Sequence, residues 1–474
     1  MAEREYDVVV IGAGAVGENV ADRAVQGGLS AVIVESELVG GECSYWACMP
    51  SKALLRAGAA VRAAQDVGGA AQAVTGSIDP RAVLRRRDEF THEWDDESQV
   101  EWLRGAGIDL VRGHGRLTGT RRVRVTGEDG AVTDLVARAA VAVCTGSAAL
   151  LPDLPGLAEI APWTSREATS SPVVPESLAI IGGGVVAAEM ATAYSDLGAE
   201  VTVIARSTLL PGMEPFAGES VGQALIERGV RVLTGRSVTA ASRDTQGATL
   251  TLPDGSAVRA AQVLVAAGRV PRTADLGLDT VGIIPGDWLD VDDTLLVAGT
   301  DWLYAVGDVN HRALLTHQGK YQARAAGDVI AARATGSPVD DAPWGVHAAT
   351  ADHRAVPQVT FTDPEVASAG LTAAAAEAAG LRTRVVDYDL GDVAGASARA
   401  DHYAGRARMV VDEDRGVVVG ATFVGPDTGE LLHAATIAIV GEVPLARLWH
   451  AVPAYPTVSE VWLRLLEAYG RPSV

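Results

Sequence analysis

The sequence predicts an α/β protein of several domains, and three observations lead to this prediction. The chain has 474 residues, which is too long for one ordinary hydrophobic core. Its composition, with 48% hydrophobic residues and 52 glycines, is typical of a globular protein. Two widely separated segments each combine an apolar strand, a glycine-rich turn and an alanine-rich helix, which is the pattern of a parallel βαβ unit.

The first βαβ unit lies at the start of the chain. An apolar run at residues 8–11 leads into a G-x-G-x-x-G motif formed by Gly12, Gly14 and Gly17, and the next strand ends at Glu35. Glycines let a pyrophosphate approach the backbone where a helix begins, and an acid roughly 20 residues further on accepts hydrogen bonds from a ribose. The segment therefore predicts a dinucleotide site with these four residues as contacts.

Two cysteines, Cys43 and Cys48, follow this unit closely. In a regular helix, residues five apart have Cα atoms roughly 8 Å from each other, beyond the roughly 7 Å limit for a disulfide, so a bond requires a distorted first turn. A close pair in a chain with three cysteines favours redox chemistry over a structural framework, and no further Cys or His lies beside it to complete a metal site. The spacing predicts a reducible bridge.

Lysine is used very sparingly in this chain. Of 39 basic residues only two, Lys52 and Lys320, are lysine. A compact ammonium differs from a guanidinium in shape and hydration, so Lys52, four residues after Cys48, indicates a specific electrostatic role. For Lys320, chance retention at a solvated surface position is as good an explanation as a specific electrostatic role.

The second βαβ unit begins at Leu178. Its turn contains Gly182 and Gly184, an alanine replaces the third glycine, and the second strand ends at Ala205 and Arg206 instead of an acid. A guanidinium suits a ribose 2′-phosphate, whereas a carboxylate suits a 2′-hydroxyl. Arg206 therefore favours NADPH, with NADH still possible; the alternative is a solvated surface arginine.

Three further segments complete a specific resemblance, and they lie at residues 143–147, 266–271 and 304–308. With them, the chain resembles the class I pyridine nucleotide-disulfide oxidoreductases, the family of dihydrolipoamide dehydrogenase, glutathione reductase and mercuric reductase, over essentially its whole length. The resemblance implies two Rossmann-like dinucleotide-binding domains, for FAD and NAD(P), and a C-terminal α+β dimerisation domain. The implied boundaries are 1–150 and 276–345 for the FAD-binding parts, 151–275 for the NAD(P)-binding domain, and 346–474 for the dimerisation domain.

The resemblance also implies roles for individual residues. Cys48 faces the flavin and Cys43 exchanges with an outside disulfide, while Glu189 is the ionic partner of Lys52 beside the flavin. The implied FAD contacts beyond the glycine motif are Glu35, Lys52, Gly115, Thr145, Gly146, Asp308 and Thr316. The implied NADPH contacts are Gly182, Gly184, Val185, Arg206, Gly268 and Arg269. A turn formed by the glycine pair Gly113 and Gly115 before a strand explains these residues equally well. Cys144, in an apolar run, is expected to be a packing residue.

The C-terminal motif departs from the family pattern. The family has His-Pro-Thr-x-x-Glu, and this chain has Tyr455 in the histidine position, followed by Glu460. Tyrosine titrates near ~10, so Tyr455 can donate a proton but is a poor general base at pH 7. His450 is an alternative acid or base, although a structural or solvated role is favoured. Tyr45 and Trp46 either narrow the substrate entrance or pack as core.

The motifs and the resemblance predict an FAD-containing, NAD(P)H-dependent enzyme, a homodimer, that reduces a small-molecule or protein disulfide through Cys43. One alternative is direct reduction of a quinone or a metal ion by the flavin, which needs no proton relay at position 455. Another is a non-enzymatic flavin redox sensor. Mercuric reductases carry a vicinal cysteine pair at the C-terminus, which residues 470–474 lack. Soluble transhydrogenases usually lack one of the two redox cysteines, which this chain keeps. Dihydrolipoamide dehydrogenase and glutathione reductase keep the histidine that Tyr455 replaces here. The electron acceptor therefore stays open.

Charge and the N-terminal segment limit the partners and the location. The net charge of −21 and a pI near 4.8 argue against a general nucleic-acid surface and against attraction to anionic lipid. Neither a signal peptide nor a membrane span precedes the first strand, so we expect a cytoplasmic protein. No resident metal is expected.

Overall fold

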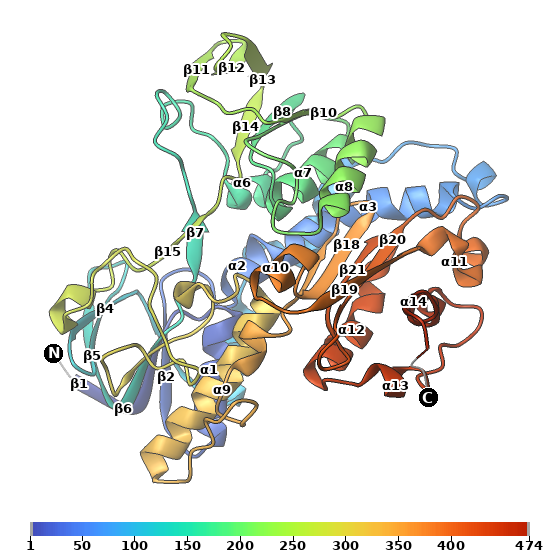
Figure 1. Cartoon of the computed structure of the whole chain (residues 1–474). Coiled ribbons are helices and arrows are strands. Elements are labelled where there is room, and N and C mark those ends of the chain that lie inside the picture. The colour runs from blue at the N-terminus through green and yellow to red at the C-terminus, as the bar shows by residue number, and fades with distance from the viewer. Residues whose placement is uncertain (1–2, 472–474) are drawn as a thin grey trace. The chain divides into compact units, whose positions relative to one another are not determined.

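The computed structural model describes residues 3–471, which form two compact units (Figure 1). The first unit contains residues 3–50, Asp88–Leu150 and Arg269–His353, and the second contains Ser51–Arg87, Leu151–Gly268 and residues 354–471. One boundary of the units lies between Leu150 and Leu151, and the segment Ser51–Arg87 belongs to the second unit. The FAD-binding, NAD(P)-binding and dimerisation boundaries stay predictions.

The first unit is built on a mixed sheet with a parallel centre. Its strand order is β3-β2-β1-β6-β5-β4, and β16 pairs with β6 beside this path. Strand β1 is parallel to β2 and β6, whereas β4, β5 and β6 are antiparallel. The strands are β1 (Glu3–Ile11), β2 (Ala31–Glu35), β3 (Asp109–Arg112), β4 (His114–Gly119), β5 (Arg122–Thr126), β6 (Val132–Val143) and β16 (Leu303–Ala305). The first glycine motif follows β1 at the carboxyl edge of the parallel strands, where dinucleotides bind in such sheets.

Two helices of this unit, α1 (Ala15–Gln26) and α9 (Thr316–Thr335), pack closely against each other. Glycines permit the approach, because a Cβ at Gly319 would lie 2.6 Å from a Val16 methyl group. This contact places the beginning of α9 beside the beginning of α1. The other regular elements of the unit are α5 (Glu97–Gly105), β7 (Ser147–Ala149) and β15 (Arg269–Pro271).

The second unit contains a four-stranded parallel sheet in the order β10-β9-β8-β14. Its strands are β8 (Ser177–Ile181), β9 (Glu200–Ala205), β10 (Arg231–Thr234) and β14 (Gln262–Val265), with helices α6 (Ser165–Ser170), α7 (Val185–Asp196) and α8 (Pro215–Glu227). A separate antiparallel sheet is formed by β11 (Ala240–Asp244), β12 (Gly247–Thr251) and β13 (Ala257–Ala260). Helix α7 follows the second glycine motif and is buried at every residue from 187 to 194.

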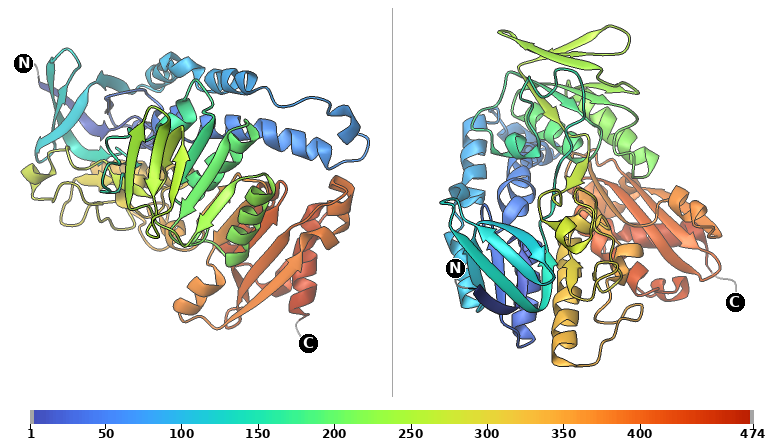
Figure 2. Two further views of the ribbon diagram at one scale, coloured as in Figure 1. Left: turned by 90° about the horizontal axis from the view of Figure 1, so that it is seen from above. Right: turned by 90° about the vertical axis from the view of Figure 1, so that its left-hand side faces the viewer.

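A five-stranded antiparallel sheet completes the second unit (Figure 2). It runs in the order β17-β18-β21-β20-β19, and its central strand β21 is buried at all nine residues. The strands are β17 (Pro357–Thr360), β18 (Glu365–Gly370), β19 (Thr383–Asp389), β20 (Arg406–Asp412) and β21 (Val417–Gly425). The helices are α10 (Ala373–Ala378), α11 (Ala394–Arg399), α12 (Leu432–Val440), α13 (Leu445–Leu448) and α14 (Val461–Tyr469).

The predicted α/β class with two βαβ units is confirmed, since both glycine motifs follow a strand in a parallel part of a sheet. Helices α3 (Cys48–Gln65) and α4 (Pro80–Phe90) each contain one boundary between the units. Over residues 3–471, no helix is both long and apolar enough to cross a membrane.

Candidate active site

The two cysteines of the predicted redox pair lie on different helices that are separated by a break. Cys43 lies on α2 (Gly41–Tyr45), and Cys48 is the first residue of α3. Trp46, with φ −137°, ends the first helix, so the distorted turn that the spacing predicts is confirmed. Both cysteine side chains are partly buried, and they are hydrogen-bonded to each other. The break therefore brings together two sulfurs that a regular helix would separate.

Some neighbours of Cys43 raise the pKa of its thiol, and others lower it. The hydrogen bond to Cys48 is the largest cause that raises the pKa of Cys43, and burial adds to it. The Thr316 side chain and the charge of Lys320 lower that pKa. Thr316 begins α9, and its Oγ1 lies 3.3 Å from the Cys48 sulfur. Lys320, whose role the sequence left open, therefore lowers the pKa of Cys43 through its charge, as the smallest of these effects.

Lys52 and Glu189 form an ion pair within the second unit. The Lys52 ammonium lies 2.8 Å from Glu189 Oε2 and 3.1 Å from Oε1. The Phe361 N–H donates to Glu189 Oε1 at 2.9 Å, and its ring centroid lies 4.7 Å from the ammonium. Glu189 is only 3% exposed, so its charge depends on these two partners. The pairing implied by the resemblance is present in the geometry.

The first glycine motif forms a tight turn that leaves space at the start of α1. Gly12 has φ +104°, and a Cβ there would lie 2.5 Å from the Cys144 carbonyl oxygen; at Gly17 a Cβ would lie 1.9 Å from the Gly12 oxygen. These two glycines are required by the backbone itself. At Gly14, in contrast, no atom lies within 4 Å of a Cβ position. The open position at a helix N-terminus fits a bound phosphate group.

Two acids beside this turn also fit a bound dinucleotide. Glu35 ends β2 and accepts a hydrogen bond from the Ala13 N–H at 2.7 Å, and burial raises its pKa. Glu18, in the first turn of α1, was missed by the sequence analysis. Burial raises its pKa to about 7, and its Oε1 is buried with no partner among the residues that the structure describes. Such an unsatisfied atom is expected where a polar ligand completes the site.

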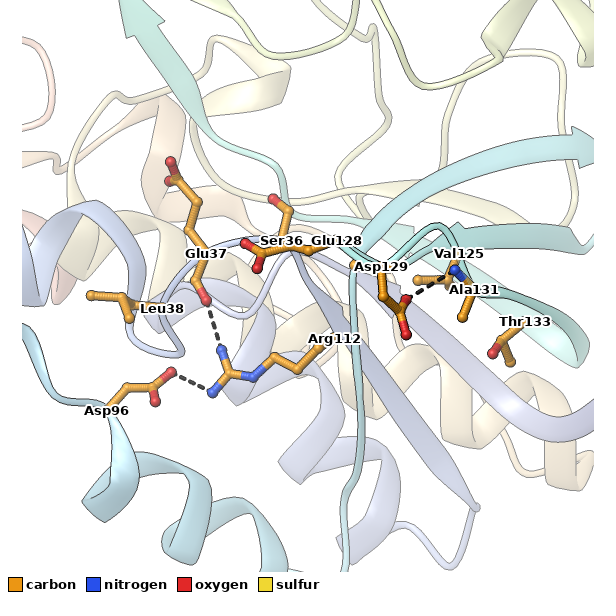
Figure 3. A pocket seen from close by; sticks show the side chains of 12 residues that line it. Ser36, Glu37, Leu38, Asp96, Arg112, Val125, Glu128, Asp129, Ala131 and Thr133 are labelled. Atoms are coloured by element: carbon orange, nitrogen blue, oxygen red, sulfur yellow. Dashed lines mark hydrogen bonds and ion pairs between the residues drawn. The ribbon is translucent and has the colours of Figure 1, made fainter.

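A cavity of about 610 Å³ lies next to Glu35 at the same edge of the sheet (Figure 3). Arg112 is fixed across it, donating to the Glu37 carbonyl at 2.7 Å and to Asp96 at 2.6 Å. The lining residues are Ser36, Glu37, Leu38, Asp96, Arg112, Gly113, Val125, Gly127, Glu128, Asp129, Ala131 and Thr133. The size and position suit the adenosine half of a dinucleotide. Sequence reasoning missed Arg112 and Asp96, and the only available signal was that Ser36 directly follows Glu35.

Four other predicted FAD contacts, Asp308, Thr145, Gly146 and Gly115, also belong to the first unit. Asp308 accepts the Ser147 hydroxyl at 2.6 Å, and burial raises its pKa. Thr145 donates to the Arg272 carbonyl at 2.9 Å, and Gly146 follows with φ +68°. Gly115 lies inside β4, where a Cβ would be 3.0 Å from a Val34 methyl group, and Gly113, with φ +141°, lies directly before this strand.

The second glycine motif has the same geometry as the first. Gly182 has φ +138°, and a Cβ there would lie 2.2 Å from the Ala266 oxygen, whereas no atom lies within 4 Å of a Cβ position at Gly184. Val185 begins α7 directly behind this open position. Arg206 is exposed and follows the last residue of β9.

Gly268 and Arg269, the other predicted NADPH contacts, end one unit and begin the other. Gly268 has φ +140° and is the last residue of its segment in the second unit. Arg269 belongs to the first unit, where it donates to the Ser147 oxygen at 2.7 Å and lies 3.9 Å from Asp308. Its guanidinium is therefore engaged with a predicted FAD contact.

The two residues of the C-terminal motif that the resemblance singles out, Tyr455 and Glu460, differ in burial. Tyr455 is 76% exposed, whereas Glu460 is 6% exposed. Arg464 donates to Glu460 Oε1 at 2.5 Å, and Glu460 Oε2 has no partner within residues 3–471. In the family pattern, this glutamate orients the imidazole of the histidine that Tyr455 replaces. His450 is exposed, as a solvated residue would be.

Tyr45 and Cys144 take the packing roles that the sequence offered for them. Tyr45 is 1% exposed and donates to the Asp95 carbonyl at 3.2 Å, so it is a core residue and not part of a substrate entrance. Trp46 is partly buried, with its ring centroid 5.6 Å from that of Tyr45. Cys144 is 7% exposed among apolar neighbours, and burial raises its pKa.

The sequence matches two family models and many characterised proteins. The model described as pyridine nucleotide-disulphide oxidoreductase matches residues 6–328, and the model of the dimerisation domain of that family matches residues 356–465. A mercuric reductase of Streptomyces lividans is 33% identical over 468 residues, covering 97% of this chain and 95% of that protein. A dihydrolipoyl dehydrogenase of Chlamydia pneumoniae is 32% identical over 471 residues, covering 97% and 96%.

Solved structures share the fold. The Cu(II) complex of the HOCl-induced flavoprotein disulfide reductase RclA of Escherichia coli superposes with a TM-score of 0.84 at 20% identity, covering 98% of this chain and 99% of that one. LpdA of Mycobacterium tuberculosis gives a TM-score of 0.82 at 24% identity, covering 99% and 100%. At these identities the likeness establishes the fold alone.

Proposed function

Because the chain belongs to the pyridine nucleotide-disulphide oxidoreductase family, which uses FAD and NAD(P)H, we propose that it is an NADPH-dependent flavoprotein that reduces a disulfide substrate through Cys43. One observation carries the proposal. Cys43 and Cys48 are hydrogen-bonded to each other across a helix break, with the Thr316 hydroxyl 3.3 Å from the Cys48 sulfur. Two cysteine side chains in that arrangement can close to a disulfide and reopen.

The cysteines perform a balanced exchange. The Cys43 thiolate attacks one sulfur of the substrate disulfide, and the other substrate sulfur leaves and takes up a proton. Cys48, as a thiolate, then attacks the Cys43 sulfur and releases the second substrate thiol. The dithiol loses two electrons and two protons, which leave with the two product thiols. Lys320 favours the first step, because its charge lowers the pKa of Cys43.

The two nucleotide sites supply reducing equivalents to this pair. Gly14, Glu35 and Asp308 would hold FAD, while Gly184 and Arg206 would hold NADPH. When bound, FAD accepts a hydride equivalent from NADPH and delivers two electrons to the disulfide. By the family resemblance, the Lys52 ammonium, anchored by Glu189 at 2.8 Å, would supply a fixed positive charge that favours the reduced form of the flavin.

The family match includes the dimerisation domain, which supports a homodimer. Apolar side chains on the matched domain are exposed in a single chain, and they include Ile437 and Val440 on α12 and Val452 after α13. We propose that the partner chain covers this surface and that Tyr455 and Glu460 contribute to the partner's active site. A cytoplasmic location remains a prediction.

A second candidate function is direct reduction of a quinone or a metal ion. The observation that favours it is the C-terminal motif, in which an exposed tyrosine replaces the imidazole and Glu460 Oε2 has no partner among the described residues. Thiol exchange benefits from a base that stores a proton near neutral pH, whereas electron transfer to a quinone or a metal ion does not depend on one at this position.

An acceptor panel tests the proposal. Purified flavoprotein is supplied with NADPH, and oxidation at 340 nm is followed with small disulfides, a protein disulfide, quinones and metal ions. We expect disulfides to support turnover with a kcat of roughly 1–10³ s⁻¹, the usual range for enzymes. Turnover with quinones or metal ions and none with any disulfide would favour the second candidate instead.

Replacing Arg206 by alanine is expected to raise the KM for NADPH by about 10–100-fold, because a charged hydrogen bond to the 2′-phosphate is lost. The KM for NADH should change by less than about twofold, since NADH has no such phosphate. Arg231→Ala is the matched control, because Arg231 is also exposed but begins β10 at the amino edge of the same parallel sheet. Equal changes for both nucleotides would show that Arg206 does not read the phosphate.

A further inference from the structure

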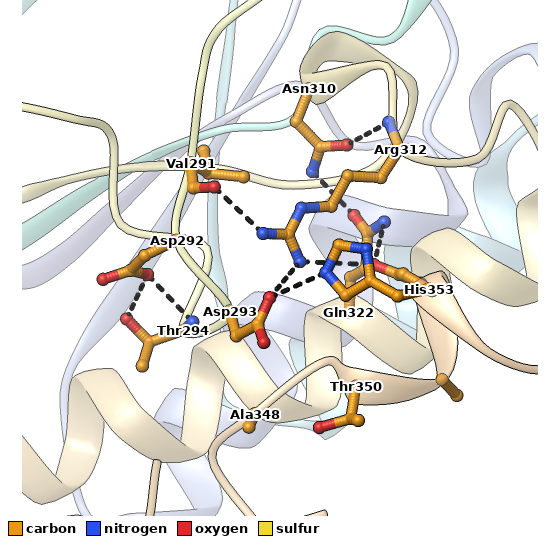
Figure 4. A network of polar contacts seen from close by, with 12 residues as sticks. Val291, Asp292, Asp293, Thr294, Asn310, Arg312, Gln322, Ala348, Thr350 and His353 are labelled. Atoms are coloured by element: carbon orange, nitrogen blue, oxygen red, sulfur yellow. Dashed lines mark hydrogen bonds and ion pairs between the residues drawn. The ribbon is translucent and has the colours of Figure 1, made fainter. Parts of the chain in front are cut away.

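The first unit contains a buried polar network that none of the proposed roles uses (Figure 4). Its centre is Asp352, whose side chain is 0% exposed. Gln318 and Gln322, one turn apart on α9, each donate from Nε2 to one oxygen of this carboxylate at 2.9 Å. Arg312 lies 3.8 Å from the carboxylate and balances its charge. Both carboxylate oxygens are therefore used, and both are acceptors.

Gln322 connects this network to the turn that carries Asp308. Its Oε1 accepts from the Gly307 N–H at 2.8 Å and from Asn310 Nδ2 at 2.8 Å. Asn310 Nδ2 also donates to the Ala305 carbonyl at 3.0 Å. Asp308, between the two residues held by Gln322, accepts the Ser147 hydroxyl at 2.6 Å. One fully buried amide thus holds the turn at two points.

The carboxylate determines which way this amide faces. A side-chain amide has an acceptor end and a donor end, whereas an ionised carboxylate only accepts. With Asp352 on one side, the NH₂ of Gln322 must face the carboxylate, and its oxygen must face the two donors of the turn. In the opposite orientation, the NH₂ would face the Gly307 N–H, and the oxygen would face the carboxylate. That orientation would leave two buried donors unsatisfied, at roughly 1–3 kcal/mol each.

We propose that Asp352 is a positioning residue for the flavin site: it fixes the Gln322 amide, and this amide holds the turn at residues 307–310 so that Asp308 can bind the ribityl chain of FAD. The proposal rests on the proposed role of Asp308. It also gives a reason for a carboxylate in a fully buried position, where an uncompensated charge is costly.

Asp293 supplies a matched control within the same network. It lies 2.9 Å from Arg312 and 2.9 Å from His353, and its side chain is 38% exposed. It therefore shares the arginine with Asp352 but contacts neither glutamine. A change at Asp293 perturbs the charge balance of the network without removing an acceptor from Gln322.

The test replaces Asp352 by asparagine in the full-length protein. Asparagine offers one acceptor to two Nε2 donors, so one glutamine must turn. We expect FAD affinity, measured by quenching of flavin fluorescence on titration of the flavin-free protein, to fall about tenfold. We also expect faster amide hydrogen exchange at residues 307–310 before FAD is added. Asp293→Asn should leave both quantities within about twofold of the original protein.

A second substitution separates amide orientation from general damage. In D352N/Q318E the new carboxylate accepts from the asparagine NH₂, so the asparagine oxygen is free to accept from Gln322. We expect this double variant to recover FAD affinity to within about threefold of the original protein and to restore slow exchange at 307–310. If D352N does not fold, Gln322→Met, which removes the acceptor of the Gly307 N–H and keeps Asp352, is expected to show the same two changes.

The outcomes are distinguishable. Unchanged hydrogen exchange at 307–310 in a folded D352N or Gln322→Met variant would overturn the proposal. Faster exchange together with unchanged FAD affinity would show that the turn does not bind flavin, which would overturn the role proposed for Asp308 and, with it, the role of Asp352. Weaker binding without recovery in D352N/Q318E would show that amide orientation is not the cause.

Discussion

Replacing Cys43 by serine is expected to reduce NADPH-dependent disulfide turnover by at least about a thousandfold, because a serine hydroxyl is neither ionised at neutral pH nor able to exchange with a disulfide. Reduction of a quinone or dye directly from the flavin should persist in the same variant. The Cys48 sulfur lies 3.3 Å from Thr316 Oγ1, a contact that does not involve the Cys43 side chain. The measurement is steady-state NADPH oxidation with a disulfide and, separately, with a quinone.

Cys144→Ala is the control for this prediction. Cys144 is the third cysteine, 7% exposed in an apolar environment, so its removal tests whether loss of any thiol reduces turnover. We expect Cys144→Ala to retain disulfide turnover within about twofold. Full disulfide turnover in the Cys43→Ser variant would refute the assignment of Cys43 as the exchanging thiol.

Replacing Lys52 by methionine is expected to lower the free energy of unfolding by about 2 kcal/mol, since Glu189 would remain buried without its ionic partner. The Glu189 side chain is 4% exposed and would keep only the Phe361 N–H at 2.9 Å. The loss is smaller than the roughly 3–5 kcal/mol for a fully buried pair, because the Lys52 side chain is 35% exposed. Urea denaturation of the flavin-free protein, followed by tryptophan fluorescence, measures this effect.

A double-mutant cycle identifies the pair as the cause. Glu189→Gln removes the buried charge and keeps a similar shape, so K52M/E189Q should lose less stability than the sum of the two single variants. The expected coupling is roughly 1–2 kcal/mol. Strictly additive losses would mean that Lys52 and Glu189 stabilise the fold independently.

Residues whose role is set by local backbone geometry could be predicted from the sequence. Gly12 and Gly182 stand where φ is positive and a Cβ would meet a carbonyl oxygen, so the motif spacing alone located both turns. The Cys43 and Cys48 spacing predicted a broken helix for the same local reason. In these cases the physics acts within a few residues along the chain.

Residues whose role depends on distant segments could not be predicted in this way. Tyr45 looked able to line an entrance, but its hydroxyl reaches the Asp95 carbonyl, 50 residues away. Arg112 lines the cavity because Asp96 and the Glu37 carbonyl hold its guanidinium. Asp352 carries no motif, since its partners lie 30 and 34 residues earlier in the chain. A single sequence does not encode such contacts in a pattern that can be read.

The segment Ser51–Arg87 shows the same limit at the level of domains. The resemblance places it in the FAD-binding part with the rest of residues 1–150, and this assignment stays a prediction. Its apolar side chains pack in one core with α7 and β8, and they include Leu54, Leu55, Val83 and Leu84. Apolar residues at helical spacing indicate that a face is buried, but not which sheet covers it.

An anaerobic NADPH titration of the purified flavoprotein, beside the Cys43→Ser variant, tests the central claim most directly. If the Cys43 and Cys48 pair exchanges electrons with the flavin, the original protein will take up two electron pairs, and a long-wavelength absorbance band from a thiolate beside the flavin will appear. The variant will take up one pair. Bleaching of the flavin in one step, with one electron pair in both proteins, would show that the cysteines take no part and would contradict the account.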